Sequence, residues 1–503
     1  MRGLHALLRW VAWALAVFAL LVATAVFAFA VQARLTLPDL RPWHRVVLAG
    51  EFHAGRKNVS SFADYLRLEE RLFAELEARL LDDPRLADPY ALGRYHPGSA
   101  PWRLALEAPY NRSYELAPAD PKGAVLLVHG LTDSPYSMRA LAEVFHAEGL
   151  HVVVLRLPGH GTVPSMLREV SRKDWQAALE LAAAYTASRA GPDEPFYIAG
   201  YSMGAALVTL HALRSLEDPA LARPDRLFLL SPAIGLSKLA FLTKFMSVLS
   251  LVPGFEKSAW IEVLPEYDPY KYNSFPVHAA NQIYHLTGDL HRALVSAGET
   301  GRLAEMPPIT VFHSLVDATV STEDVVRNLL SRLPAGGHAL VLFDVNRQEA
   351  LQGLIAAEPI RYLEQMRSAR AMPFRATLIA NRNAASLEIA AYTRDSGSLD
   401  VSVRELPLAW PPGVYSLGHV ALPFPPDDPV YGLFPPPPRG SGDGPRFPIG
   451  SFSARGESGA LRVPVALLAR LRSNPFFDVI RERVEEACRE DGSAVPSNPT
   501  RTP

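Results

Sequence analysis

A serine stands between two glycines in the segment GYSMG, residues 200–204. The strand-like run FYIA, residues 196–199, precedes this segment, and the helix-like run AALVTLHALRSL follows it. A serine at a sharp turn from strand to helix can act as a nucleophile, and flanking glycines let neighbouring backbone approach closely. The spacing alone also occurs in glycine-rich turns that only cap a helix. The strand and the helix around it favour Ser202 as a nucleophile.

Two other segments carry a family resemblance. HGLTDSPYS at residues 129–137 and LRLPGHGT at residues 155–162, together with GYSMG, resemble the α/β-hydrolase superfamily. The similarity is to its serine-hydrolase branch of monoglyceride-lipase and lysophospholipase type, and it covers residues 123–345. It implies an oxyanion hole made by the backbone N–H groups of Leu131 and Met203. With this resemblance we expect His129 and His160 to be structural residues that support their loops; the alternative is a role in proton transfer.

The acid of a catalytic triad in this fold follows the serine and precedes the histidine. Asp317, in ITVFHSLVDATVS, comes shortly after the strand-like run 309–312 and before a helix-like stretch. This is where the family carries its acid. The alternative is an ordinary residue of a helix N-terminal turn.

The histidine departs from the family pattern. The family places it just after the last strand, here residues 339–343, but the loop DVNRQE that follows has no histidine. Of the 15 histidines, only His338 and His419 lie beyond Asp317. His338 precedes its strand, which puts it at the end of the sheet opposite Ser202. We therefore expect His419 to be the base, since the closure entropy of a long intervening loop rises only slowly with length.

This trio predicts acyl transfer without a cofactor. His419 would remove the proton of Ser202, the serine would attack an acyl carbonyl, and Asp317 would orient the imidazole. The sequence has no HExxH motif, no paired Cys/His spacing for a metal and no Gly-x-Gly-x-x-Gly for a dinucleotide.

The elements that must position these residues form an α/β pattern. Short apolar runs alternate with helix-like stretches from residue 111 onward, which predicts a doubly wound, mostly parallel sheet. The expected strands are 124–128, 152–155, 196–199, 227–230, 309–312 and 339–343. The expected helices are 137–148, 174–189, 203–216 and 322–333.

The chain divides into eight expected regions. They are an N-terminal membrane anchor (1–31), a helical extension (32–110), a first segment of the hydrolase core (111–234), a cap (235–305), a second segment of the core (306–346), a β-rich insertion (347–412), a histidine-bearing loop with the C-terminal region (413–490) and a flexible tail (491–503). Within them we expect an amphipathic helix at 60–81, strands at 376–379, 387–392 and 399–403, a proline-rich loop at 423–448 and a terminal helix at 477–488.

The segment from Trp10 to Val31 is uncharged and almost wholly apolar, and it is long enough to cross a bilayer. A cleaved secretory signal is the alternative, because Arg2 and Arg9 precede the segment and Ala28-Phe29-Ala30 resembles a cleavage site. The flanking charges favour neither orientation. We expect a single-pass anchor with the large domain on the extracytoplasmic side, because long domains translocate largely regardless of charge.

Composition narrows the function classes. The 503 residues are 49% hydrophobic and 20% charged, which is typical of a globular protein. Lys+Arg at 50 nearly balances Asp+Glu at 52, so nucleic-acid binding is not indicated. The single cysteine, Cys488, excludes an internal disulfide and a zinc site built on several thiolates.

The expected substrate is a carboxylic ester, and the apolar, aromatic cap favours a lipid-like acyl chain. Those cap residues could equally be plain core. The same triad also serves thioesterases, amidases and acyltransferases. A catalytically silent, anchored scaffold is an alternative of another class, although it need not retain Ser202, Asp317 and His419. The sequence leaves the oligomeric state open.

Overall fold

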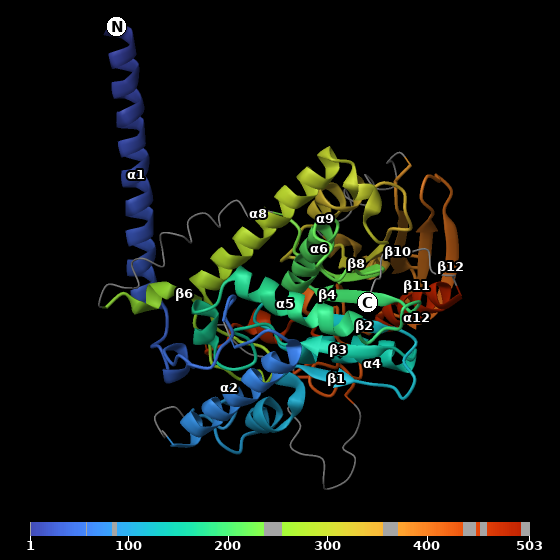
Figure 1. Cartoon of the computed structure of the whole chain (residues 1–503), viewed down its shortest axis with the longest axis horizontal. Coiled ribbons are helices and arrows are strands. Elements are labelled where there is room, and N and C mark those ends of the chain that lie inside the picture. The colour runs from blue at the N-terminus through green and yellow to red at the C-terminus, as the bar shows by residue number, and fades with distance from the viewer. Residues whose placement is uncertain are drawn as a thin grey trace.

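A central sheet organises the computed structural model, which describes residues 2–56, 58–82, 88–235, 254–355, 371–435, 449–452 and 460–493. Within these residues the sheet has ten strands in the order β1-β3-β2-β4-β5-β8-β9-β10-β11-β12 (Figure 1). The strands are β1 Tyr114–Leu116, β2 Ala124–Val128, β3 His151–Leu155, β4 Phe196–Tyr201, β5 Arg226–Leu230, β8 Ile309–Ser314, β9 Ala339–Phe343, β10 Arg375–Asn381, β11 Glu388–Arg394 and β12 Ser402–Ala409. Neighbours from β3 through β10 pair in parallel, whereas β1, β11 and β12 pair antiparallel.

Helices cover both faces of this sheet, as the alternation of strands and helices predicts. The side chains of β2 show why: Leu126 packs with the helices of one face, whereas Leu127 packs with those of the other. One face carries α5 Arg172–Ala187, α6 Met203–Ser215, α8 Val277–Glu299 and α9 Thr322–Asn328, and the other carries α4 Arg139–Ala147 and α12 Phe477–Ser493. All five residues of β2 are buried, which is typical of a parallel strand covered on both sides. The predicted α/β-hydrolase architecture of the core is confirmed.

The strands beyond β9 extend the main sheet. Arg375 of β10 pairs in parallel with Ala339 of β9, and β11 and β12 follow as antiparallel neighbours. The third of the strands expected here lies at Ser402–Ala409, later than the expected 399–403. As an edge strand, β12 tolerates Pro407, which cannot donate to a ladder.

The segment between β5 and β8 holds a short hairpin and a long helix. Strands β6 Trp260–Glu262 and β7 Phe275–Pro276 pair antiparallel, and α8 runs from Val277 across the sheet face (Figure 1). The apolar residues Phe241, Phe245, Met246, Val248 and Leu249 of the expected cap lie outside the described residues. So do residues 436–448 of the expected proline-rich loop and residues 494–503 of the expected tail.

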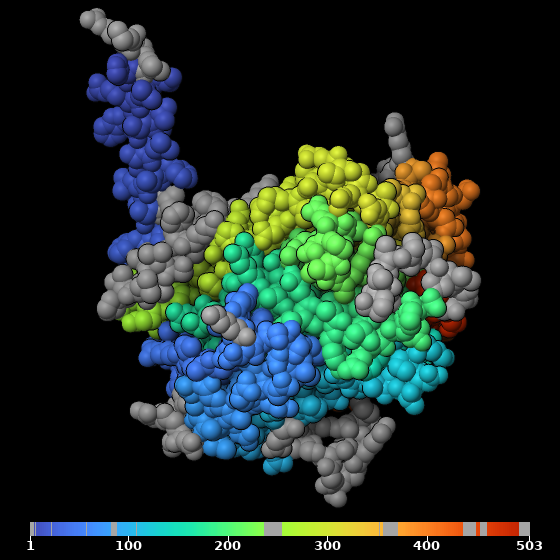
Figure 2. Space-filling model, in the orientation of Figure 1, coloured from blue at the N-terminus to red at the C-terminus, as the bar shows by residue number. Residues whose placement is uncertain are grey.

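The N-terminal helix α1, Arg2–Thr36, projects from the rest of the molecule (Figures 1 and 2). Among the described residues one helix, Leu7–Thr36, is long and apolar enough to cross a membrane. Its last turns pack against residues that precede β6. Phe27 and Phe255 have ring centroids 6.2 Å apart, and Lys257 Nζ lies 3.0 Å from Asp39 Oδ1.

The expected helical extension is joined to the sheet by a buried charge cluster. Helix α2, Phe62–Asp82, supplies Glu69, whose Oε2 lies 3.0 Å from Arg156 Nε. Glu51 Oε1 lies 3.0 Å from Nη2 of the same arginine. Tyr65 donates to the carbonyl oxygen of Arg156 at 2.7 Å. Glu51, Glu69 and Arg156 are all buried, so removal of one charge would leave a buried charge without its partner. The extension is therefore part of the fold that surrounds the 155–162 segment.

Candidate active site

Ser202 lies at the turn between β4 and α6, in a backbone conformation of φ 54° and ψ −115° that non-glycine residues rarely adopt. The flanking glycines are required sterically. A Cβ on Gly204 would lie 2.4 Å from the carbonyl oxygen of Val128, and one on Gly200 would lie 2.6 Å from Cα of Ala205. The turn therefore holds the Ser202 hydroxyl at the carboxyl edge of the sheet.

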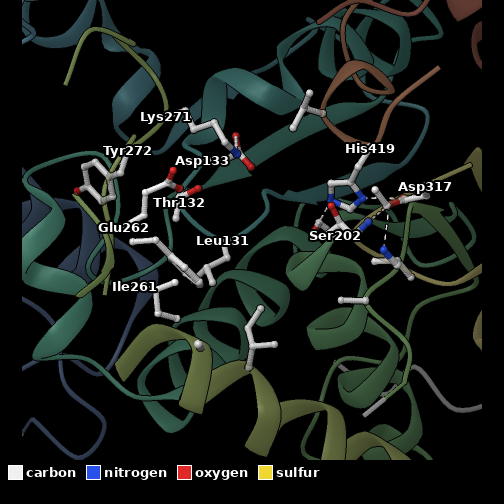
Figure 3. A pocket seen from close by; sticks show the side chains of 18 of the residues that line it. Leu131, Thr132, Asp133, Ser202, Ile261, Glu262, Lys271, Tyr272, Asp317 and His419 are labelled. Carbon is white, nitrogen blue, oxygen red and sulfur yellow. Dashed lines mark hydrogen bonds and ion pairs between the residues drawn. The ribbon is translucent and has the colours of Figure 1, made fainter. Parts of the chain in front are cut away.

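The structure brings Ser202, His419 and Asp317 together. His419 Nε2 lies 2.9 Å from Ser202 Oγ, and His419 Nδ1 lies 2.7 Å from Asp317 Oδ2. Figure 3 shows the imidazole between the hydroxyl and the carboxylate. Both contacts are hydrogen-bond distances, so a proton on Nδ1 would leave Nε2 free to accept from the serine.

Asp317 is set up to remain ionised. Burial would raise the pKa of its carboxyl group, but the hydrogen bond from His419, the charges of His419 and His313 and the N–H of Val320 outweigh burial. The net effect lowers the pKa of Asp317 from 3.8 to about 2. Its other oxygen, Oδ1, accepts from the backbone N–H groups of Thr319 at 2.7 Å and Val320 at 2.9 Å.

His419 reaches this edge although the loop after β9 has no histidine. That loop instead holds the returning chain: the N–H of Asn346 donates to the carbonyl oxygen of Tyr415 at 2.8 Å, and its side-chain amide donates to that of Val414 at 3.0 Å. Ser314, at the end of β8, donates to the carbonyl oxygen of Leu417. His419 then begins a short 3-10 turn that ends at Ala421.

His338 lies at the other end of the sheet, as its position before β9 predicts. Its Nδ1 accepts from the N–H of Ile309, the first residue of β8, at 3.2 Å. Burial lowers its pKa. This imidazole therefore joins two strands at the amino edge, remote from Ser202.

The two residues expected to form the oxyanion hole, Leu131 and Met203, belong to the segments that follow β2 and β4. Met203 is the first residue of α6, so its N–H has no acceptor within the helix. Leu131 follows β2 and lines the cavity together with Ser202. The carbonyl oxygen of the next residue, Thr132, accepts from the N–H of Tyr272 at 2.8 Å, which ties this loop to the segment between β5 and β8.

His129 and His160 are buried behind this loop. His129 Nε2 accepts from the N–H of Leu157 at 3.0 Å, so its Nδ1 carries the proton and donates to the carbonyl oxygen of Gly130 at 2.8 Å. The two histidine rings have centroids 4.9 Å apart. Burial lowers the pKa of His129 far below its usual range and that of His160 to about 3. Both side chains therefore remain neutral and brace the 129–131 and 155–162 segments.

A third histidine near the site was not identified from the sequence. His313 lies within β8, and its Nδ1 is 4.0 Å from Asp317 Oδ2. Burial lowers its pKa to about 4, although the charge of Asp317 opposes that change. The position of His313 within an apolar strand does not indicate a role at the site. Only the fold of the loop after β8 brings its ring close to the Asp317 carboxylate.

Ser202 and His419 open onto a cavity of about 930 Å³. Apolar side chains contribute much of its wall, including Leu131, Ile234, Ile261, Leu264, Phe275 and Ile283. The charged side chains that line it, besides the catalytic candidates, are Asp133, Glu262, Lys271, Asp324, Arg470 and Arg472. A volume of this size accommodates a molecule larger than a short-chain ester.

An ion pair lines the cavity next to Leu131, one of the residues expected to form the oxyanion hole. Lys271 Nζ lies 3.0 Å from Asp133 Oδ1, and Figure 3 shows the pair above Leu131 and Ile261. Burial raises the pKa of Asp133, and Lys271 opposes that change. No sequence pattern marks Lys271, since it lies in the loop before β7 and far along the chain from Asp133.

Among the described residues, no group of three or more His, Cys, Asp or Glu side chains is arranged to hold a metal ion. The arrangement of Ser202, His419 and Asp317 is that of a nucleophile, a base and an orienting acid. Such an arrangement can carry out the transfer of an acyl group.

Comparison with known proteins agrees with this architecture. Residues 119–345 match the model of a family described as serine aminopeptidase, S33. A thermostable monoacylglycerol lipase of Bacillus sp. (strain H-257) is 39% identical over 83 residues, which are 16% of this chain and 32% of that relative. The aligned segment thus spans about a third of the relative's length. The resemblance to α/β-hydrolase serine hydrolases is confirmed.

Solved structures also overlap with about half of the chain. A structure from work on LipS and LipT, two metagenome-derived lipolytic enzymes, is 21% identical and covers 52% of this chain and 99% of its own, with a TM-score of 0.37. A monoacylglycerol lipase of Paleococcus ferrophilus is 18% identical and covers 46% of this chain and 88% of its own, with a TM-score of 0.34.

Proposed function

We propose that the protein hydrolyses carboxylic esters through Ser202, His419 and Asp317, in keeping with the resemblance of its core to α/β-hydrolase serine hydrolases. The hydrogen bonds that join His419 Nε2 to the Ser202 hydroxyl and His419 Nδ1 to the Asp317 carboxylate are the observation that carries the proposal. A scaffold without activity would not need a base within 2.9 Å of the hydroxyl or an acid within 2.7 Å of the base.

The reaction has two halves. His419 takes the proton of Ser202 as the serine oxygen attacks the acyl carbonyl, and Asp317 stabilises the imidazolium that forms. The N–H groups of Leu131 and Met203 stabilise the negative oxygen of the tetrahedral intermediate. His419 then gives its proton to the leaving alcohol, and a water molecule, activated by the same histidine, releases the acid from Ser202.

The proposed substrates are lipid-like esters. Apolar side chains from the segment between β5 and β8 line the cavity, and this segment would act as the cap. Leu131, Ile261 and Phe275 offer an acyl chain a surface that excludes water. The relative named a monoacylglycerol lipase supports a substrate of this kind.

Helix α1 would hold the enzyme in a membrane. About 20 residues suffice to cross the hydrocarbon core, and the span Leu7–Thr36 has 30. The contacts of Phe27 with Phe255 and of Asp39 with Lys257 join the end of this helix to the proposed cap. The proposed orientation puts the catalytic domain on the extracytoplasmic side, because long domains translocate largely regardless of flanking charge.

Labelling with a fluorophosphonate probe tests the nucleophile, because the probe needs an activated serine and an oxyanion hole. The full-length protein should be labelled, and Ser202→Ala should abolish the label. Ser296→Ala, at an exposed position of α8, is the matched control and should leave labelling intact. Label that survives Ser202→Ala contradicts the nucleophile, and an unlabelled wild type favours a silent scaffold.

The base is tested by comparing the two candidate histidines. His419→Ala should lower ester turnover by at least about a thousandfold, because members of a triad act as a unit. His338→Ala removes a contact at the opposite edge of the sheet and should cost far less turnover. Turnover of matched esters, thioesters and amides by the wild type would also separate hydrolysis of esters from the related activities.

Membrane attachment is tested on the full chain. Membrane fractions should retain it after a carbonate wash, and removal of residues 1–31 should release active protein. A mature N-terminus near residue 31 with soluble activity would indicate a cleaved signal instead.

A further inference from the structure

The C-terminal region contributes two arginines to the cavity that holds Ser202 and His419. Arg470 and Arg472 follow the short helix α11, Val465–Leu468, and both line this cavity, as does Leu467. They lie about 50 residues beyond His419 and outside the 119–345 segment that matches the family model. The fold of this chain's own C-terminal region therefore brings two cations to the site.

Arg470 lies beside the base. Its Nε and Nη2 are 3.6 Å and 4.0 Å from the point where a Cβ on Gly418 would sit, and Gly418 directly precedes His419. Within the part of the chain that the structure describes, no carboxylate forms an ion pair with Arg470. Its side chain is partly exposed to the cavity, so its donors are available to a ligand.

Arg472, whose side chain is 11% exposed, is held by neighbouring groups. Its Nη2 donates to Tyr267 at 3.1 Å and to the carbonyl oxygen of Leu467 at 3.3 Å, and its Nη1 is 3.6 Å from Asp268 Oδ2. These contacts fix the guanidinium and the chain that carries Arg470. Nε of Arg472 is buried and has no hydrogen-bond partner among the residues that the structure describes.

The other charges of the cavity do not neutralise Arg470. Asp133 is paired with Lys271, and Asp317 with His419. Asp324 accepts from the side-chain amide of Asn328 at 2.9 Å. Glu262 lies beside Ile261, on the side of the cavity away from His419 (Figure 3). Among the described residues, Arg470 therefore keeps a charge that no carboxylate of the cavity wall neutralises in an ion pair.

We infer that Arg470, supported by Arg472, forms an anion subsite for the alcohol part of the substrate. The inference rests on the proposed function, in which His419 gives its proton to the leaving alcohol oxygen. The alcohol part must therefore lie on the His419 side, next to Arg470. A guanidinium binds phosphate and carboxylate through two parallel hydrogen bonds, so the substrate class is an acyl ester whose alcohol carries one of these groups.

Three lauroyl esters with the same acyl chain test this subsite in the full-length enzyme. They are lauroyl glycerol, which is neutral, lauroyl glycerol phosphate and O-lauroyl glycolate, each presented as dispersed monomers. The wild type should have a higher kcat/KM for at least one anionic ester than for the neutral ester. Preference for the phosphate or for the glycolate alone would identify which anion the subsite takes.

Arg470→Gln should lower kcat/KM for the preferred anionic ester by about ten- to a hundredfold, the usual effect of a lost charge-assisted hydrogen bond. The neutral ester should lose much less. Arg470→Lys should retain part of the preference, because it keeps the charge but not the planar fork. The preference should also fall as salt is added. Arg481→Gln, on the exposed side of α12, is the matched control and should change none of these ratios.

Equal losses of kcat/KM on all three esters in Arg470→Gln would contradict the anion subsite and give Arg470 a structural role. A wild type that does not prefer an anionic ester would also contradict the subsite. Fluorophosphonate labelling of each variant separates this failure from that of the proposed function. A wild type that labels at Ser202 and cleaves the neutral ester without an Arg470-dependent preference contradicts the subsite alone. A wild type that neither labels nor cleaves any ester contradicts both.

Discussion

The side-chain amide of Asn346 donates to the carbonyl oxygen of Val414 at 3.0 Å, across 68 positions of the chain. Asn346 lies in the loop after β9, where the family pattern would place a histidine. In this chain the loop receives the returning segment, and His419 follows five residues after Val414. Asn346 Oδ1 also accepts from the side chain of Asn381 at 3.1 Å, so the amide joins β10 to the histidine loop.

Asn346→Ala should therefore lower kcat more than it changes KM, because a displaced loop moves the base while leaving the cavity wall in place. The lost contacts of a buried amide should also lower the free energy of unfolding by about 1–3 kcal/mol. Steady-state kinetics and urea unfolding measure the two effects. Asn383→Ala, in the exposed turn between β10 and β11, should change neither, and equal effects of both variants would contradict this role of Asn346.

Asp317 gives the folded state a specific dependence on acid. Its pKa is lowered from 3.8 to about 2 in the fold, so its contribution is complete above pH 4 and is lost as pH falls through 2. The size of this contribution is about 2 kcal/mol. Asp317→Asn should flatten the fall in unfolding free energy over this range and lower ester turnover by at least about a thousandfold. Denaturant unfolding at several pH values should reveal the difference, and parallel curves would refute it.

Glu266 should give the free energy of unfolding a pH dependence opposite to that of Asp317. Burial raises the pKa of this carboxyl group from 4.5 to about 7, so folding favours its protonated form. Stability is then greatest below pH 4.5 and falls by about 3 kcal/mol as pH rises through 7. Glu266→Gln cannot ionise and should show a smaller fall in unfolding free energy between pH 5 and pH 8. An unchanged fall in the variant would assign that pH dependence to other groups.

The close packing around Gly204 predicts that adding one methyl group there strongly destabilises the fold. Gly204→Ala would put a Cβ 2.4 Å from the carbonyl oxygen of Val128, so β2 and α6 must separate. We expect loss of several kcal/mol of stability and of fluorophosphonate labelling. Gly298→Ala, at an exposed position of α8, meets only Leu303 Cδ1 at 3.5 Å and should gain up to about 1 kcal/mol of helix stability. Thermal unfolding compares the two substitutions, and similar melting temperatures would contradict the steric argument.

Much of the core was predictable because its signals are local. The apolar run 124–128 is a strand with the bounds that the sequence predicts, and the GYSMG turn lies between β4 and α6. The chain order of the triad left two histidines, and strand polarity separated them. His338 could be rejected because a residue before a parallel strand lies at the edge opposite Ser202.

The remaining features depend on contacts between distant segments. The sequence indicates strands near residues 376 and 387, but their pairing with β9 is set by long-range packing. The meeting of Asp133 with Lys271 and the position of Arg470 beside Gly418 also require the finished fold. Charged side chains have no periodicity that marks a cavity, so the composition of its wall could not be deduced from the sequence.

Strand β12, at the edge of the sheet, has a consequence for contacts between copies of the protein. An open strand edge offers unpaired N–H and C=O groups to another chain. In β12 the imino nitrogen of Pro407 has no hydrogen to donate, and the exposed Arg404 and Glu405 add charge beside an irregular register with β11. This strand is therefore a poor template for edge-to-edge polymerisation, and crowded molecules can remain separate without a protein cover over that edge.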